Sequence, residues 1–327
     1  MSAVRRNVSR HIVGSGVELG PGPKPFPVDY PGVETTYLDR WEPDENRGLF
    51  QELGPGADFV KPDIICNLDT DKLKMLDDAS QDYVIASHVL EHMADPIGLF
   101  DEIHRVLKPG GIALILLPDM RRTFDHTRPV TPLQHLVAEY RAGVTEVDDA
   151  HIIEFIEHTE VDWHPTTDGK TEAELTELYD WHRQRSIHVH CWSENDFQPV
   201  IDYVITDLGH EWEFVDGILT DDEGPDGIEF GYVMRRGLVE MPPSVRVERF
   251  KATRDAWADH RRQIHATIRT VEEATIAHNN ATAALAAAES GATGYAIKAA
   301  RKARPYVDRA VKAARDRVSS TPPASPG

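Results

Sequence analysis

Cysteine is almost absent from this chain, which has only Cys66 and Cys191 among 327 residues. Two cysteines without metal-ligand spacing exclude a disulfide framework and a cysteine-based zinc site. No run approaches the roughly eighteen uninterrupted apolar residues that a membrane-spanning helix needs. The arginines between Met1 and Arg10 are not followed by an apolar stretch, so no secretory signal is expected. These absences predict a soluble protein in a reducing cytoplasm.

The net charge of −20 is unevenly distributed. Residues 244–327 carry 15 Lys and Arg against 8 Asp and Glu, which leaves 20 basic against 47 acidic residues for 1–243; the two parts are therefore +7 and −27. Such an acidic body repels nucleic acid phosphates, so binding of DNA or RNA would require the basic tail. A charged stretch of this kind is more often a solvated surface, and we expect no nucleic acid partner.

Short β-rich apolar runs alternate with helical patterns from Ile12 to Pro118, as in a parallel sheet with crossover helices. One helix is well marked, since Asp95 can cap it, Pro96 suits its first turn and Gly110-Gly111 is expected to stop it. The expected strands are Gly16 to Leu19, Thr35 to Leu38, Ile64 to Cys66, Tyr83 to Ala86 and Ile112 to Leu117.

Two more apolar runs, Glu213 to Ile218 and Ile228 to Met234, would complete a seven-stranded sheet. The aperiodic stretch from Asp119 to Ile187 is interpreted as an insertion over the carboxyl edge of that sheet. We therefore predict an α/β fold: a doubly wound, mostly parallel, Rossmann-like sheet with a helical insertion and a helical C-terminal extension. The expected divisions are 1–240 with the insertion at about 120–187, an extension at 243–318, and a disordered tail at 319–327.

Small and acidic residues follow three of the expected strands. In an open parallel sheet, ligands bind beyond the carboxyl ends of the strands, where the strand order reverses. Gly20 and Gly22 let the backbone approach a ligand there, Asp39 lies where a carboxylate can accept two ribose hydroxyls, and Asp69 can face an adenine amino group. Any one of these acids could instead cap a helix, but their joint order favours a nucleoside pocket.

This order of motifs resembles that of class I methyltransferases that use S-adenosylmethionine (SAM), over roughly the first 120 residues. The motifs are Glu18-Leu19-Gly20-Pro21-Gly22, Leu38-Asp39-Arg40, Ser80 to His92 and Val106 to Gly111. The resemblance implies SAM as cofactor, with Glu18, Gly20 and Gly22 at the methionine end, Asp39 on the ribose, Asp69 near adenine, and Ser87 and His88 beside the sulfonium. The full expected cofactor set is Glu18, Gly20, Gly22, Asp39, Arg40, Leu68, Asp69, Ser87, His88 and His92.

The segment after the glycines departs from that family. Members usually begin a helix here, but Pro21, Pro23, Pro25 and Pro27 cannot sustain one. We therefore predict no helix, and expect Lys24 or Arg40 to support the methionine carboxylate instead.

Histidines and arginines of the later region suggest a substrate site. An alcohol must lose its proton to attack the methyl group of the sulfonium, and His is the side chain best suited to accept that proton near neutral pH. The expected catalytic set is His88, His188, His190 and Asp119, with His126 a further candidate base. His188 and His190 are expected on one face of a strand, where they could act as base, form a metal pair with Asp119 or Asp125, or simply pack; no metal is expected. The expected substrate set is Arg121, Arg122, Asp125, His126 and Arg128, whose guanidinium groups can clamp an anion or pair with local acids.

The stretches Pro118 to Asp125, Arg128 to Thr131 and Ile187 to Ser193 resemble a bacterial methyltransferase subgroup found in cell-surface polysaccharide contexts. That resemblance implies methyl transfer to an oxygen of a small molecule, a sugar or glycan precursor. The alternatives are N- or carboxyl-methylation of a metabolite, and a non-catalytic SAM-binding module that organises a glycan-assembly complex.

The Ala-rich C-terminal region is expected to be helical, with a break at Gly291 to Gly294 and a second helix that starts near Pro305. It has two interpretations. Lys298, Arg301, Lys302 and Arg304 could contact anionic membrane lipid as a peripheral site. Alternatively, Ile264, Ile268 and Val271 form a helical seam for a homo-oligomer or for a docked partner, which we favour because alanine anchors weakly to membranes.

Overall fold

The computed structural model describes residues 3–54, 56–159 and 167–289, with side chains up to residue 283. By its internal contacts the chain divides into two units, Met1–Arg254 and Asp255–Gly327. The first unit contains every strand found among the described residues and every residue expected at the cofactor and substrate sites.

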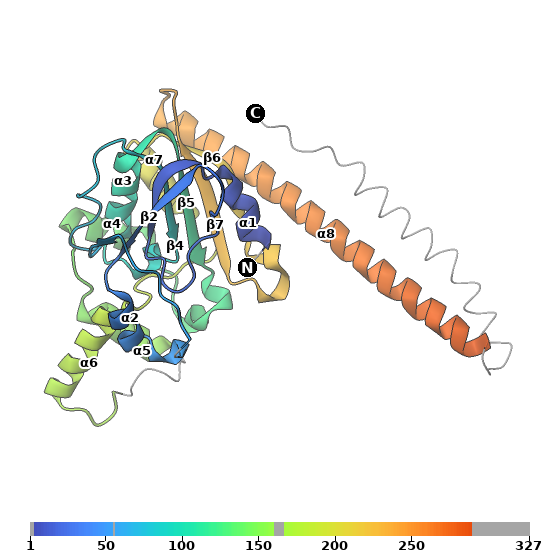
Figure 1. Ribbon diagram of the computed structural model, residues 1–327, viewed down its shortest axis with the longest axis horizontal. Helices are drawn as coiled ribbons and strands as arrows, with labels where there is room; N and C mark the ends of the chain where they lie inside the picture. Colours follow the sequence, from blue (N-terminus) through green and yellow to red (C-terminus); the bar gives the residue numbers. More distant parts are fainter. Residues whose placement is uncertain (1–2, 55, 160–166, 290–327) are drawn as a thin grey trace. The chain divides into compact units, whose positions relative to one another are not determined.

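The first unit is built on a seven-stranded sheet in the order β3-β2-β1-β4-β5-β7-β6 (Figure 1). The order reverses between β1 and β4, and all pairs are parallel except those of β7, which runs antiparallel to β5 and β6. This confirms the predicted fold class. The strands are β1 Gly14–Leu19, β2 Val33–Asp39, β3 Ile64–Ile65, β4 Gln81–Ser87, β5 Leu107–Pro118, β6 Trp212–Ile218 and β7 Glu229–Arg236.

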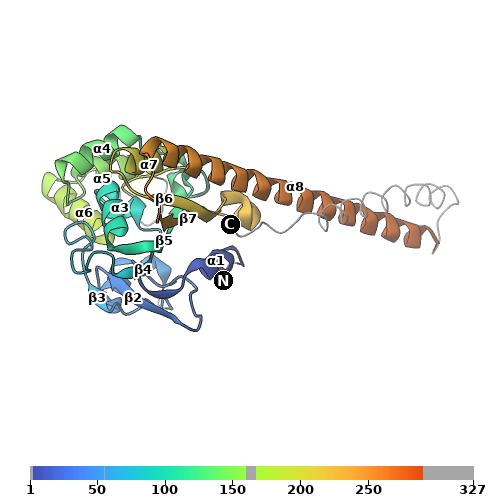
Figure 2. The same cartoon turned by 90° about the horizontal axis from the view of Figure 1, so that it is seen from above.

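Both faces of the central strands are buried, which explains their nearly continuous apolar runs. On one face, Tyr83, Ile85 and Leu114 pack with Val8 of helix α1 (Ala3–Val8) and with Phe26 of the proline-rich segment. Helices α3 (Pro96–Val106) and α7 (Gln198–Thr206) contact one another on the other side of the sheet (Figure 2).

Helix α3 begins as predicted but ends earlier. The carboxylate of Asp95 accepts a hydrogen bond of 2.8 Å from the amide of Gly98, and Pro96 occupies the first turn. The expected stop at Gly110-Gly111 is wrong, because the helix ends at Val106 and Leu107 is already extended. Pro109 disfavours helical dihedrals in the residue before it, so the chain passes directly into β5.

The insertion is helical, with α4 Leu133–Ala142, α5 Asp149–His158 and α6 Glu172–Arg185. Side chains of Asp148 and Thr171 cap α5 and α6. Between β1 and β2 no helix forms in residues 20–32, all of which are described, as the prolines predicted. After β2 comes the short helix α2, Pro43–Leu49.

Helix α8 (Pro243–Glu289) begins in the first unit and continues in the second. Ile264, Ile268 and Val271 lie on it, and Ile268 is 46% exposed; the docking seam stays a prediction. The expected break at Gly291 to Gly294, the second helix near Pro305, the basic cluster at Lys298, Arg301, Lys302 and Arg304, and the tail at 319–327 lie outside the described residues. Of the helices within the described ranges, none is long and apolar enough to cross a bilayer.

Candidate functional site

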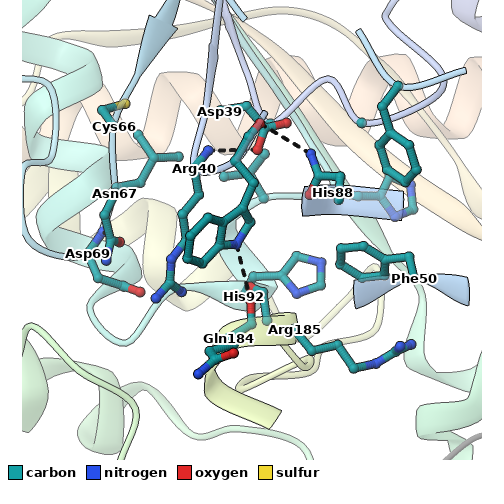
Figure 3. A pocket seen from close by; sticks show the side chains of 18 of the residues that line it. Asp39, Arg40, Phe50, Cys66, Asn67, Asp69, His88, His92, Gln184 and Arg185 are labelled. Carbon is teal, nitrogen blue, oxygen red and sulfur yellow. Dashed lines mark hydrogen bonds between the residues drawn. The ribbon is translucent and has the colours of Figure 1, made fainter. Parts of the chain in front are cut away.

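A cavity of about 230 Å³ lies beyond the carboxyl ends of β1, β2 and β4, where the strand order reverses (Figure 3). Gly20, Asp39 and Asp69, which come from three separate stretches of sequence, all line it. Eight of the ten residues expected to bind the cofactor are in its wall: Gly20, Gly22, Asp39, Arg40, Leu68, Asp69, His88 and His92.

Asp39 ends β2 with its carboxylate at this cavity. One oxygen accepts a hydrogen bond of 2.7 Å from the amide of Arg40. Burial raises the pKa of Asp39, while hydrogen bonds from the amides of Arg40, Trp41 and Gly22 and from Asn46 oppose the shift. Gly20 and Gly22 have φ near +54° and +53°, which glycine adopts without strain. A carboxylate beside exposed backbone is the arrangement that suits ribose hydroxyls.

Asp69 and several aromatic residues form the rest of the wall. The Asp69 carboxylate accepts 2.8 Å from the amide of Ala94, and burial raises its pKa. Trp41 and Phe50 add flat apolar surface, as a purine needs. Sequence reasoning missed both, because nothing local marks an aromatic residue as a pocket wall.

The end of α6 closes one side of the cavity. The indole of Trp41 donates to the carbonyl of Gln184 over 3.3 Å, and Arg40 donates to the carbonyl of Arg183 over 3.1 Å. Gln184, Arg185 and Ser186 line the cavity about 140 residues after the strands that they meet. They were not expected, since this contact depends on how the insertion folds back.

Two expected cofactor residues lie elsewhere. Glu18 is buried, and its carboxylate accepts 2.8 Å from the amide of Phe26, so it holds the proline-rich segment against the sheet. Burial raises the pKa of Glu18 to about 7. Ser87, the last residue of β4, does not line the cavity. Of the two residues expected to support the methionine carboxylate, Lys24 does not line the cavity and Arg40 does.

His88 stands between two carboxylates at the edge of the cavity. Its Nε2 lies 2.8 Å from Oε2 of Glu229 and its Nδ1 lies 3.5 Å from Oε1 of Glu91. Its φ of +57° is unusual for a residue with a side chain, a kind of strain often found at functional sites. Burial opposes ionisation of Glu229, but the ion pair with Arg5 and the bond to His88 lower its pKa to about 2. Neither Arg5 nor Glu229 was expected here.

A second group of titratable side chains lies behind His88. Glu91 is fully buried, and that burial raises its pKa to about 7. His92 bonds through Nδ1 to the carbonyl of Ile187 at 2.9 Å, and burial lowers its pKa to about 3. His188 Nδ1 lies 2.6 Å from Asp125. One ligand atom each from Glu91, His92 and His188 fall within 4.8 Å of one another, so these three could also hold a cation.

Replacing Glu91 with glutamine should remove a pH-dependent loss of stability. A carboxyl with a folded-state pKa near 7 and an unfolded value near 4.5 costs nothing below pH 4.5, and its cost grows as pH rises to about 7 and then stays constant. We expect E91Q to gain about 2–3 kcal/mol in unfolding free energy relative to wild type between pH 4.5 and 8. Urea unfolding across this range measures it, and E157Q, at an exposed glutamate, should show no such trend. A flat difference for E91Q would contradict the assignment.

The strand expected at His188 and His190 is wrong. Ser186 adopts φ of +62°, and the amides of Val189 and His190 both donate to the carbonyl of Glu91. This irregular backbone sends the two rings into separate clusters, His188 to Asp125 and His190 toward Glu139. Alternating histidines in a short stretch resemble a strand, but here tertiary hydrogen bonds decide the backbone.

Asp119 and the expected substrate residues are mainly engaged with the protein itself. Asp119 is buried between Arg121 and the hydroxyl of Thr220. Arg122 pairs with Asp221, and His126 bonds to the carbonyl of Thr123. The expected substrate residues Arg121, Arg122, Asp125, His126 and Arg128 are all outside the cavity wall.

Arg128 in particular has no donor left for a substrate. Its guanidinium is 1% exposed and bonds to the carboxylates of Asp125 and Glu154 and to the carbonyls of His188 and Val189. These contacts use all five N–H groups of the side chain. The anion clamp expected of Arg128 is therefore not supported; the residue ties the insertion to the 187–190 segment.

Comparisons with known proteins give one family match and a set of solved structures of low sequence identity. Residues 42–115 match the family model described as a methyltransferase domain. A search of the curated proteins finds no match. Solved structures with a similar fold include a SAM-dependent methyltransferase from Methanosarcina mazei (14% identity, 73% of this chain and 99% of that one, TM-score 0.37).

Two further solved structures show how broad this likeness is. One is a SAM-dependent methyltransferase from Aquifex aeolicus (12% identity, 71% of this chain and 89% of that one, TM-score 0.35). The other is a protein from Rhodobacter sphaeroides described provisionally as a zinc-dependent alcohol dehydrogenase (13% identity, 72% and 90%, TM-score 0.39). Likenesses at this level carry no argument about activity.

Proposed function

We propose that this chain, whose methyltransferase domain uses S-adenosylmethionine, transfers the methyl group to an oxygen of a small molecule, a hydroxyl of a sugar or glycan precursor. One observation carries the proposal: Gly20, Asp39 and Asp69 meet in a single cavity at the point where the strand order reverses. The family match to residues 42–115 spans several of the residues that line this cavity. When bound, the cofactor supplies an electrophilic methyl group on a sulfonium.

The residues of the cavity fit that cofactor. Asp39 offers carboxylate oxygens to the ribose, Asp69 offers an acceptor to the adenine amino group, and Trp41 gives the purine a flat surface. Backbone at Gly20 and Gly22 leaves room for the methionine end, because a Cβ at Gly22 would meet nothing within 4 Å. Arg40 in the same wall can pair with a carboxylate.

Oxygen as the acceptor atom is supported by the proton-accepting groups beside the cavity. A hydroxyl must lose its proton as it attacks, and His88, one of the two histidines that line the cavity, can take it at Nδ1. Glu229 orients this ring through Nε2, which leaves Nδ1 facing the cluster around Glu91. Glu91, whose Oε1 lies 3.5 Å from that Nδ1 and whose pKa burial raises to about 7, can accept the proton from His88.

A sugar is supported by the polar groups of the cavity and by charge. Asn46, Asn67 and Gln184 line the cavity and can exchange hydrogen bonds with hydroxyls. The net charge of −27 on residues 1–243 disfavours polyanionic acceptors and favours a neutral hydroxyl compound.

Titration calorimetry of the protein with SAM and with its demethylated product tests the cofactor. We expect binding of both, and no binding of either at millimolar concentration would overturn the proposal.

Transfer from methyl-labelled SAM to cell-surface glycan fractions tests the acceptor. H88N should lower the rate about 100-fold or more, while H158N, at an exposed histidine, should not. Binding without transfer to any fraction would indicate a non-catalytic module.

The acceptor can also be sought in cells. Mass spectrometry of surface glycans from cells with and without the protein should show the loss of mass increments of one methyl substituent. If the glycans are unchanged and labelled methyl groups are transferred to an amine or carboxyl metabolite, the acceptor is not a sugar hydroxyl.

A further inference from the structure

Four side chains converge on one point of the insertion, away from the cofactor cavity. His135 and Glu139 lie one turn apart on α4, His151 is on α5, and His190 is on the irregular segment before Trp192. Oε1 of Glu139 is 3.0 Å from Nε2 of His135 and 3.1 Å from Nε2 of His151, and its Oε2 is 3.3 Å from Nε2 of His190. One ligand atom from each residue fits within a span of 4.8 Å.

Contacts within the protein do not account for all four groups. His190 is 0% exposed, and although its Nε2 lies 3.3 Å from Oε2 of Glu139, neither ring nitrogen makes a hydrogen bond among the described residues. Oε2 of Glu139 is also buried, with no hydrogen-bond partner in that part of the chain. A buried polar atom without a partner costs on the order of 1–3 kcal/mol. Hydrogen bonds among His135, Glu139 and His151 would satisfy the polar atoms of those three side chains. They would leave the ring nitrogens of the buried His190 unsatisfied.

The donor set suits a divalent transition metal. Imidazole nitrogens with one carboxylate are ligands of zinc and its neighbours, whereas Ca²⁺ and Mg²⁺ prefer oxygen only. With metal–ligand bonds near 2.0–2.1 Å, tetrahedral ligand atoms lie roughly 3.3 Å apart. The separations of 2.8 Å between Nε2 of His135 and Nε2 of His151, and of 3.0 to 3.3 Å from the histidines to one or the other oxygen of Glu139, lie near that value, and the whole set of ligand atoms spans no more than 4.8 Å.

Neighbouring groups prepare these ligands. Nδ1 of His151 lies 2.7 Å from Oδ1 of Asp148, a carboxylate contact that directs Nε2 of the ring toward the cluster. Burial opposes ionisation of Glu139, yet the histidines lower its pKa to about 2, so it is an anion. Burial lowers the pKa of His190 to about 3, so its ring is neutral with a lone pair to donate.

An ion can reach the cluster from the surface. His135 and His151 line two surface hollows of about 280 and 430 Å³, and the side chain of His135 is 42% exposed. Glu139 also borders the first hollow and His190 the second, although both residues are buried. An exposed ligand at which an ion can enter, with buried ligands that then hold the ion, is the arrangement expected of a tight site.

We propose that His135, Glu139, His151 and His190 bind one divalent metal ion of the zinc type in a closed, four-coordinate site. The ion joins α4 and α5 to the 187–190 segment. Because the amides of Val189 and His190 donate to the carbonyl of Glu91, the ion also positions the titratable group beside the cofactor cavity. The site contributes stability and placement; four protein ligands leave no open position for chemistry on the metal.

Metal analysis of tag-free protein tests the proposal. Protein purified from zinc-supplemented medium should contain about one metal ion per chain. After chelation, adding Zn²⁺ at 100 times its dissociation constant should raise the Tm by about 5 °C or more. Substitution of Co²⁺ should give the intense visible absorption of a tetrahedral site. Protein that stays metal-free, with a Tm indifferent to Zn²⁺, Co²⁺ and Mn²⁺, would overturn it.

Matched variants locate the site. E139Q keeps the shape of the side chain and H190N removes the buried ligand, and each should lower zinc affinity at least about 100-fold. H158N on the same helix α5 is the control, because His158 is exposed and outside the cluster, and it should bind as wild type does. If H190N does not fold, E139Q and the Co²⁺ spectrum decide. Wild-type affinity in E139Q would exclude this ligand set, whatever the outcome of the methyl-transfer assays.

Discussion

Replacing Asp39 with alanine is expected to weaken the binding of SAM about 100-fold. The carboxylate at the end of β2 lines the cofactor cavity and can accept both ribose hydroxyls. Two hydrogen bonds to a charged group at a half-buried position contribute together about 3 kcal/mol, which corresponds to a factor of about 100 in the dissociation constant. Titration calorimetry of D39A with SAM measures the change.

Two variants separate this effect from a general loss of structure. D39N keeps one acceptor and should bind between wild type and D39A. D44A removes an acid from the neighbouring helix α2, where the side chain is 96% exposed, and should bind as wild type does. Equal affinity of D39A and wild type would remove Asp39 from the cofactor site and with it the strongest support for the pocket.

Replacing Arg128 with methionine is expected to lower the free energy of unfolding by about 3–5 kcal/mol. The change leaves the carboxylate of Asp125 buried with only His188 and the hydroxyl of Thr123 as partners, and a buried charge that has lost its main ion pair carries this penalty. It also frees the carbonyls of His188 and Val189, which Arg128 now satisfies. Urea unfolding at neutral pH measures the loss.

The matched control is R122M. Arg122 has the same shape but a half-exposed side chain paired with the exposed Asp221, so its loss should cost no more than about 1 kcal/mol. A loss below about 1 kcal/mol in R128M would mean that the insertion does not depend on this residue.

The strands and the cofactor motifs could be predicted because their signals are local. Apolar runs of strand length are interrupted where the chain turns; Gly20 and Asp39 directly follow such a run, and Asp69 comes three residues after one. Parallel strands bring their carboxyl ends to one edge, so a local position in sequence becomes a shared place in space. The same reasoning gave Asp95 as the cap of α3, since capping acts within one helical turn.

Residues that act through distant contacts could not be predicted in this way. Glu229 meets His88 because β7 inserts between β5 and β6, and Arg5 reaches it across more than 220 positions. His190 was noticed in the sequence, but His135, Glu139 and His151 were not, because α4 and α5 meet only after the insertion has folded. Glu91 lies in the Ser80 to His92 motif, but its complete burial depends on how distant segments pack around it.

The position of β7 has a consequence for synthesis on the ribosome. β5 pairs with β7 along its whole apolar stretch, with Pro118 opposite Glu229. A growing chain that has emerged as far as Pro118 therefore has one edge of the apolar strand β5 unpaired. The partner strand β7 becomes available only after more than a hundred further residues have been translated. At about 5–20 residues per second this takes roughly 5–20 s. Chaperones that bind nascent chains would have to act in that interval, before β7 and Glu229 have been synthesised.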